Sequence, residues 1–422
     1  MTNAWRGGAT HILRSRVLAS ALDPLVTSGT MFLVQGAVLL TVSKTAFASY
    51  SLAYSYVVMG QAVLSALFGG PLITLLSGLP DEPARVRAAA AALRLQLVFA
   101  VMMGSAGVGL ATAIGLPAAP AVLAALSMIG LSFRDAMRSV LASQLRFSAA
   151  LAIALWFATI TALALGAVWL LTGHVTAEGG LLALAIGALG TVSKAIVRTL
   201  AEHARFPPAA GRQLMRMAIW SLPGATFSWL QNSFYLTLVA VNLSLDAAGE
   251  ISAARMIAVP VLITASGLLR LSQVQATRKL SSEGLSSALR SARRFALACL
   301  AAGAIAAGAC WKADAAISRD WLPHAYPHLL QLAGAWLAFA AATTARGFFT
   351  SLFQAMGRYR ELFVCGAIIL PFVLGGVLLG PLAFGLSGAV VPMAAGELLL
   401  LLLLAARARR GDATGTSTSR SD

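Results

Sequence analysis

The sequence has few charged residues, few cysteines and few histidines for its length. Only 11% of its 422 residues are Asp, Glu, Lys or Arg, which is less than half of the roughly 25% found in soluble domains. The three cysteines, an odd number that lies entirely in apolar stretches, exclude a disulfide framework. The cysteines have no metal-ligand spacing, and of the five histidines only His324 and His328 are four residues apart, beside prolines in a predicted loop that does not favour a metal site. We therefore expect no metal site and no cofactor.

Motifs for catalysis are also missing. The sequence has no Gly-rich phosphate loop followed by Lys and no Ser-His-Asp constellation. We expect no catalytic residues, so an enzyme is the minority interpretation. An integral membrane glycan polymerase stays open as an alternative, but it would be expected to carry a long hydrophilic loop with carboxylates. The longest outer loop that we predict, 312–326, is short, and its only carboxylates are Asp314 and Asp320.

Apolar residues dominate what is present. Hydrophobic residues make up 59% of the chain and the mean hydropathy is +0.81. Long apolar runs such as 95–116 and 398–406 could not face water. The net charge of +16 would suggest nucleic acid in a soluble protein. Here the basic residues lie in short gaps between apolar runs, so we predict a polytopic membrane protein with no nucleic-acid partner.

A membrane-spanning helix needs about 20 apolar residues, and this length predicts about twelve transmembrane helices. The fold class that we predict is an all-α polytopic membrane protein with two six-helix halves around a central cavity. The halves are an amino-terminal lobe, 1–205, and a carboxy-terminal lobe, 206–422, separated by the hydrophilic gap 201–213. The predicted spans are 21–43, 47–76, 91–115, 119–144, 148–172, 179–200, 214–243, 248–273, 294–312, 327–355, 361–384 and 386–406.

The distribution of basic residues predicts the orientation. With twelve spans, nearly all gap bases fall on one side, and the other side receives only Lys44, Lys312 and Arg319. The basic side of a membrane protein faces the cytoplasm. We therefore predict a multi-pass protein of the bacterial inner (plasma) membrane with both termini cytoplasmic. Weak matches between the halves, at shifts of 201 and 208 residues, favour a parallel duplication.

Charged residues inside the predicted spans are candidates for function. A charge at the centre of a span costs about 2.5–3.5 kcal/mol on the insertion scale, and such residues usually face the bundle interior or a water-filled cavity. Arginine offers a planar fork that suits phosphate, so a cavity lined by arginines would bind a polyanion. The alternatives are snorkelling to the interface and, for Asp135 and Arg138, simple pairing. The predicted substrate-binding residues are Arg134, Arg138, Arg255 and Arg346.

Two carboxylates are candidates for coupling transport to an ion. Asp23 precedes Pro24 at the cytoplasmic entrance of the first span, where a helix-cap role explains it more simply. Glu397 lies in the middle of the last span, so a cap cannot explain it. For Glu397 the alternatives are a proton or cation role and pairing with a basic residue elsewhere in the chain.

Three segments resemble a known superfamily. Gly249–Pro260 is similar to the start of the eighth helix of the multidrug/oligosaccharidyl-lipid/polysaccharide exporter superfamily. Arg346–Phe349 with Gln354–Arg360 resembles its tenth helix and following turn, and Phe384–Ala389 resembles the entry to its twelfth. The polysaccharide-export branch, which includes O-antigen flippase-like proteins, is the most similar, and Arg255 lies at a recognisable family position.

The resemblance implies a flippase that works by alternating access. Its substrate would be a polyprenyl-pyrophosphate-linked oligosaccharide, moved across the plasma membrane for polysaccharide export. Its partners would be this lipid-linked oligosaccharide, membrane lipids and other polysaccharide-assembly proteins. A cation-coupled antiporter of drugs or metabolites in the same superfamily is the main alternative. A non-transporting scaffold of a polysaccharide-assembly complex is a third.

Overall fold

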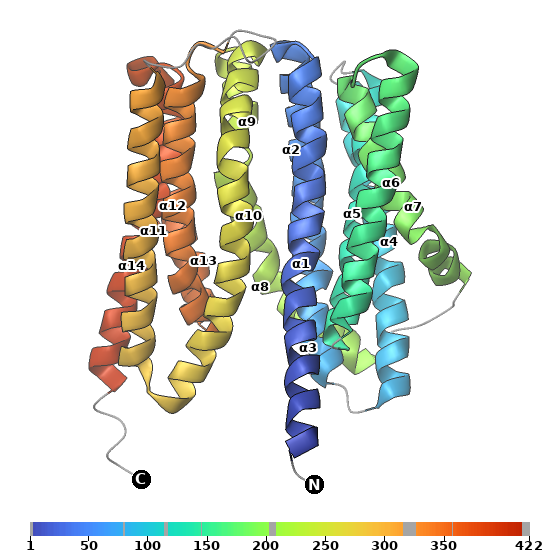
Figure 1. The fold of residues 1–422 in the computed structure, drawn as a ribbon, viewed down its shortest axis with the longest axis vertical. Coiled ribbons are helices and arrows are strands. Elements are labelled where there is room, and N and C mark those ends of the chain that lie inside the picture. The colour runs from blue at the N-terminus through green and yellow to red at the C-terminus, as the bar shows by residue number, and fades with distance from the viewer. Residues whose placement is uncertain are drawn as a thin grey trace. The chain divides into compact units, whose positions relative to one another are not determined.

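The computed structural model describes residues 3–78, 81–113, 117–144, 146–201, 208–314, 326–356 and 358–415, and every element in these ranges is helical (Figure 1). The predicted all-α fold is confirmed. Residues 202–207 and 315–325 are not described, so much of the predicted central gap and outer loop lies outside the described residues. The chain divides into two compact units, Met1–Thr226 and Phe227–Asp422. This division lies inside a helix, whereas the sequence placed the boundary at 205/206.

The elements of the first unit are α1 (Asn3–Thr41), α2 (Lys44–Leu64), the π-helix η1 (Ser65–Gly69), α3 (Gly70–Gly78), α4 (Glu82–Ala113), α5 (Ala118–Ser143), α6 (Phe147–Thr172), α7 (Ala177–Ala201) and the first part of α8 (Pro208–Asn232). The second unit contains the end of α8, then α9 (Tyr235–Asn242), α10 (Leu245–Ser282), α11 (Leu285–Asp314), α12 (Leu329–Ala355), α13 (Tyr359–Phe384) and α14 (Ser387–Gly415).

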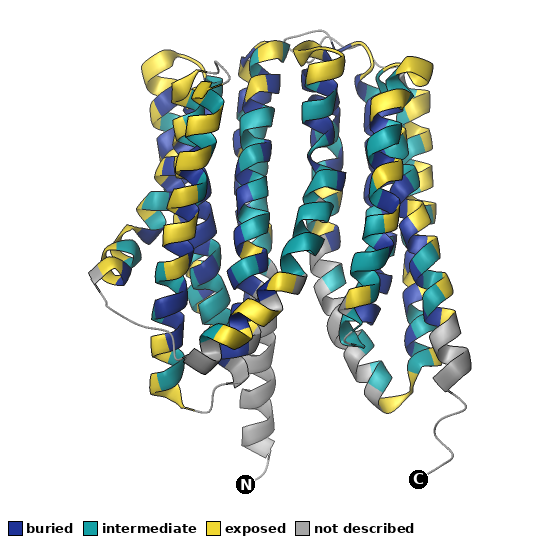
Figure 2. Ribbon diagram, turned by 180° about the vertical axis from the view of Figure 1, so that it is seen from behind, coloured by how far each residue is buried: buried dark blue, intermediate teal, exposed yellow. Residues whose placement is uncertain are grey.

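The helices follow the predicted spans but are often longer. Ten helices in the described part of the chain are long and apolar enough to cross a membrane. Large apolar side chains such as Trp156, Leu171 and Ile305 are exposed, as a bilayer-facing surface requires. Exposed positions, in yellow, recur along many of the helices (Figure 2). Helix α12 does not meet that criterion because it carries Arg346 and several threonines, and it is instead buried along most of its length by its neighbours.

Two predicted spans are broken into pieces. The span 47–76 consists of α2, η1 and α3, and the π-turn ends where Gly70 and Pro71 follow. Proline lacks a backbone N–H, and π-turns inside α-helices often accompany such interruptions. The Ser221 hydroxyl of α8 donates a hydrogen bond of 2.5 Å to the carbonyl of Ala66 in η1. The span 214–243 consists of α8 and α9, which a turn at Ser233 and Phe234 separates.

Helix α8 contributes to both units. In the first unit its Leu214 packs with Leu64 and Phe68. In the second unit its Phe227 stacks on Phe363 of α13, with 5.4 Å between ring centroids. Pro223 lies between these two anchor points, inside the helix.

The two units share one packing scheme. In the first, α5 packs against α2, α4 and α7, and α6 packs against α7. In the second, α12 packs against α10, α11 and α14, and α13 packs against α14. Small residues allow the close approach that membrane helices use; a Cβ on Gly303 of α11 would lie 2.1 Å from the Cβ of Ala341 in α12. The repeated scheme supports the predicted arrangement in two halves.

Candidate functional site: charged clusters inside each unit

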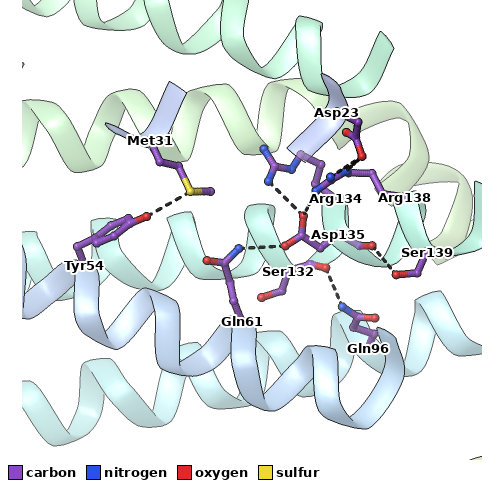
Figure 3. A network of polar contacts seen from close by, with 10 residues as sticks. All are labelled: Asp23, Met31, Tyr54, Gln61, Gln96, Ser132, Arg134, Asp135, Arg138 and Ser139. Carbon is purple, nitrogen blue, oxygen red and sulfur yellow. Dashed lines mark hydrogen bonds and ion pairs between the residues drawn. The ribbon is translucent and has the colours of Figure 1, made fainter. Parts of the chain in front are cut away.

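A cluster of four charged residues lies inside the first unit, which we call the α5 charge cluster: Asp23 of α1 and Arg134, Asp135 and Arg138 of α5 (Figure 3). Arg138 bridges the two carboxylates. Its Nε donates to Asp23 Oδ2 over 3.1 Å, its Nη2 donates to the same oxygen, and its Nη1 donates to Asp135 Oδ1 over 2.9 Å. With both carboxylates ionised, the two arginines and two aspartates have no net charge, which reduces the desolvation free energy of burying the cluster.

Arg134 is the most deeply buried member of the cluster. Its side chain has no exposed surface, and its Nη2 donates to Asp135 Oδ1 over 3.1 Å. The guanidinium lies 4.1 Å from the ring centroid of Phe157 in α6, which is a cation–π contact. Within the described residues, its Nε and Nη1 have no hydrogen-bond partner, and the same holds for Asp23 Oδ1 and Thr27 Oγ1. Buried polar atoms of this kind commonly bind ordered water.

Neutral polar groups from α2 and α4 complete the surroundings of the cluster. Gln61 of α2 donates from Nε2 to Asp135 Oδ2 over 3.2 Å, which orients that carboxylate. Gln96 of α4 donates to the backbone carbonyl of Ser132 over 2.7 Å and so ties α4 to α5 (Figure 3). Asp135 is the most exposed member, at 34% of its side chain. The cluster therefore has one partly exposed carboxylate, Asp135, and one nearly buried carboxylate, Asp23, and Arg138 donates hydrogen bonds to both.

The second unit contains an ion pair between two helices. Arg346 of α12 donates from Nε to Glu397 Oε2 of α14, and its Nη1 donates to Thr350 Oγ1 over 3.3 Å. The Glu397 side chain is 4% exposed and that of Arg346 is 21% exposed. Arg346 is thus the basic partner that the alternative interpretation of Glu397 required.

Arg255 of α10 lies among aromatic rings. Its guanidinium carbon is 5.4 Å from the ring centroid of Trp336 and 6.0 Å from that of Tyr235. Trp336 is itself held by a hydrogen bond from its Nε1 to the carbonyl of Ile251 over 3.1 Å. Among the described residues, no carboxylate pairs with Arg255. Aromatic faces stabilise a cation without neutralising it, so no described carboxylate offsets the charge of this guanidinium.

The structure adds one buried carboxylate that the sequence analysis did not propose. Glu250 of α10 is 5% exposed, and its Oε1 accepts a hydrogen bond of 2.6 Å from the backbone N–H of His328, at the start of α12. Burial and the carboxylates of Glu250 and Asp246 raise the pKa of nearby Tyr326 to about 12. The signal for Glu250 in the sequence is an acid within the first two turns of an apolar helix.

One expectation from the sequence is wrong. Asp23 is not a helix cap, because α1 begins at Asn3 and continues through Asp23 and Pro24 to Thr41. Three of the predicted substrate-binding arginines, Arg134, Arg138 and Arg346, each pair with a carboxylate. The low dielectric of a bilayer makes an unpaired buried charge costly, which explains the pairing. The predicted pairing of Asp135 with Arg138 is confirmed, at 2.9 Å.

The predicted site residues fall into three groups. Arg134 and Arg138 belong to the α5 charge cluster with Asp23, Arg346 pairs with Glu397, and Arg255 contacts aromatic rings. Their assignment to substrate binding and ion coupling stays a prediction. The side chain of Arg270, another arginine in a predicted span, lies outside the described residues. Among the described residues, no group of three His, Cys, Asp or Glu side chains could hold a metal ion.

Comparisons with known proteins identify the fold. No protein-family profile matches the chain, and no curated protein matches it. An inward-facing multidrug resistance MATE family transporter of the MOP superfamily is similar in structure, with a TM-score of 0.70, 12% identity and coverage of 96% of this chain and 99% of that chain. The eukaryotic MATE transporter AtDTX14 has a TM-score of 0.66, 11% identity and coverage of 94% and 98%.

An outward-facing MATE family transporter of the same superfamily is also similar, with a TM-score of 0.63, 14% identity and coverage of 96% of each chain. The chain therefore has the fold of MATE transporters, which typically have twelve transmembrane helices in two halves. Membership of the polysaccharide-export branch, which the sequence motifs suggested, stays a prediction.

Proposed function

We propose that the chain is a cation-coupled antiporter that moves an organic solute across the membrane by alternating access. The similarity to MATE transporters in inward-facing and outward-facing conformations supports this function. The observation that carries the proposal is the α5 charge cluster, in which the nearly buried Asp23 carboxylate is held by an arginine of another helix. Protonating Asp23 removes one of the two charges in that contact and so changes the attraction between α1 and α5.

A proton suits this carboxylate better than a metal cation does. Arg138 occupies Asp23 Oδ2 with two N–H donors, so a metal ion bound there would lie beside a guanidinium charge. Two unit charges about 4 Å apart repel by about 4 kcal/mol at an effective dielectric constant of 20. A proton neutralises the carboxylate without bringing a second cation to the site. We therefore assign the coupling ion as a proton and Asp23 as its carrier.

Proteoliposomes containing an internal pH-sensitive dye test this proposal. Ethidium as a cationic probe and fluorescein as an anionic probe are added under an imposed pH gradient, and a sodium gradient without a pH gradient serves for comparison. We expect the wild type to exchange at least one probe for protons, and Asp23→Asn to lose the exchange at least tenfold. The matched control is Asp81→Asn, because Asp81 is an exposed acid of the same unit. Proton-driven exchange that persists in Asp23→Asn refutes the assignment.

Transport of a polyprenyl-pyrophosphate glycan is the second candidate function. It is favoured by Arg255, whose charge no described carboxylate neutralises, because a pyrophosphate needs cationic partners. It is weakened by the ion pairs of the other three predicted arginines, which reduce the positive charge available to a polyanion. A flipping assay with a reconstituted lipid-linked oligosaccharide separates the two: movement of that lipid without proton exchange supports the flippase.

A further inference from the structure

Three exposed arginines lie on one face of α11: Arg290, Arg293 and Arg294, which we call the α11 arginine face. Spacings of three and four residues place side chains on the same side of an α-helix. Four residues of helix rise about 6 Å, so the three guanidinium groups share a small area. Neither the α5 charge cluster nor the ion pair of Arg346 includes this face.

The opposite face of α11 is packed, so these arginines cannot turn inward. Ala288, Ala292 and Ala296 are buried along that side. Within the described residues, none of the three arginines pairs with a carboxylate. The neighbouring Lys279 is instead occupied, because its Nζ donates to Ser291 Oγ over 3.0 Å. The α11 arginine face is therefore exposed, and no described carboxylate offsets its positive charge.

The length of the apolar span places the arginines of α11 at the expected edge of the hydrocarbon core. The apolar span containing them ends at Ala313, and a helix needs about 20 residues to cross the hydrocarbon. Counting about 20 residues back from Ala313 reaches Arg294. The same face continues toward Ala313 with Leu297 and Ile305, which are 55% and 74% exposed. An occupant of this face thus needs a hydrocarbon chain beside the leucine and isoleucine and an acidic group beside the arginines.

We propose that the α11 arginine face binds the phosphate headgroup of an anionic phospholipid in the cytoplasmic leaflet. Guanidinium forks hold phosphate oxygens through paired N–H donors, which a lysine cannot reproduce. The acyl chains would lie along Leu297 and Ile305, while the phosphate would be shared by the arginines. The lipid is thus a bound ligand of the second unit, independent of the proposed transport function.

Native mass spectrometry of the detergent-solubilised full chain tests the proposal. Dioleoyl phosphatidylglycerol is titrated against dioleoyl phosphatidylcholine, whose acyl chains are identical. Each Lys or Arg near an anionic surface contributes roughly fivefold to affinity, so three contribute up to on the order of 100-fold. We expect Arg290→Gln/Arg293→Gln/Arg294→Gln to lose at least tenfold in affinity for phosphatidylglycerol and to leave that for phosphatidylcholine unchanged.

Two further variants keep the test decisive. The dispersed control, Arg87→Gln/Arg212→Gln/Arg409→Gln, removes the same charge from exposed arginines on three other helices. We expect this control to retain phosphatidylglycerol binding within about threefold, because it leaves the α11 arginines intact. Replacing the three α11 arginines by lysine preserves charge, and we expect a loss between those of the other two variants. Equal losses in the clustered and dispersed glutamine variants would overturn the proposal, as would displacement of the lipid by millimolar inorganic phosphate.

Discussion

Replacing Glu397 by glutamine separates a structural ion pair from an ion-coupling carboxylate. The change leaves Arg346 charged and without its partner in the interface between α12 and α14. Breaking a buried pair by removing one member costs about 3–5 kcal/mol. Because the Arg346 side chain is 21% exposed, we take the lower end of that range. At about 2–4 °C per kcal/mol for a unit of 150–250 residues, the apparent Tm falls by roughly 6–12 °C.

The assay is a temperature series on detergent-solubilised protein, with the monodisperse fraction measured by size-exclusion chromatography. The double variant Arg346→Met/Glu397→Gln should recover most of the loss, because removing both charges leaves no unpaired ion. The matched control is Glu361→Gln, since Glu361 pairs with Arg358 in a more exposed setting, at 27% and 34%. An exposed pair contributes about 0–1 kcal/mol. A Glu397→Gln protein as stable as the wild type refutes the pairing, and if its transport is also lost, the carboxylate serves coupling instead.

Three further predictions concern other contacts. Arg138→Met should lower the apparent Tm more than Arg134→Met does, because Arg138 pairs with carboxylates on two helices, whereas the only carboxylate that Arg134 pairs with among the described residues is its sequence neighbour; equal losses would contradict this. Gly60→Leu should lower the free energy of unfolding by about 1–3 kcal/mol through overpacking, because a Cβ at this position would lie 2.0 Å from a methionine sulfur. Gly36→Leu should be tolerated, because a Cβ there would have nothing within 4 Å. Arg255→Met should cost about 0.5–2 kcal/mol of cation–π energy in the same assay, and Arg255→Lys should cost less; a larger loss in the lysine variant would contradict a cation–π role.

Much of the helical fold could be predicted because each transmembrane segment is encoded locally. The apolar runs near 148–172 and 361–384 correspond closely to α6 and α13. The helix ends were less predictable, because α-helices continue beyond the apolar run wherever polar residues also favour helix. Helix α11 begins at Leu285, well before the predicted span at 294. The interruption at η1 was missed because it depends on the backbone rather than on hydropathy.

The partners of the charged residues were harder to predict than their depth. Asp135 and Arg138 are three residues apart on one helix, so their contact follows from spacing. Asp23 and Arg138 are separated by 115 positions and Arg346 and Glu397 by 51, so these contacts depend on which helices pack together. The cost of an unpaired charge in a bilayer indicates that partners exist, but only the three-dimensional packing identifies them.

Helix α8 is anchored by side-chain contacts in each of the two units. Most linkers between domains are loops, which absorb rotation at little energetic cost. Here a continuous helix takes the place of a loop. Its Leu214 and Ser221 contact α2 and η1, and its Phe227 stacks on a ring of α13. Pro223 lies between these two sets of contacts and lacks the backbone N–H that would stiffen the helix there, so a bend in α8 is expected at this turn.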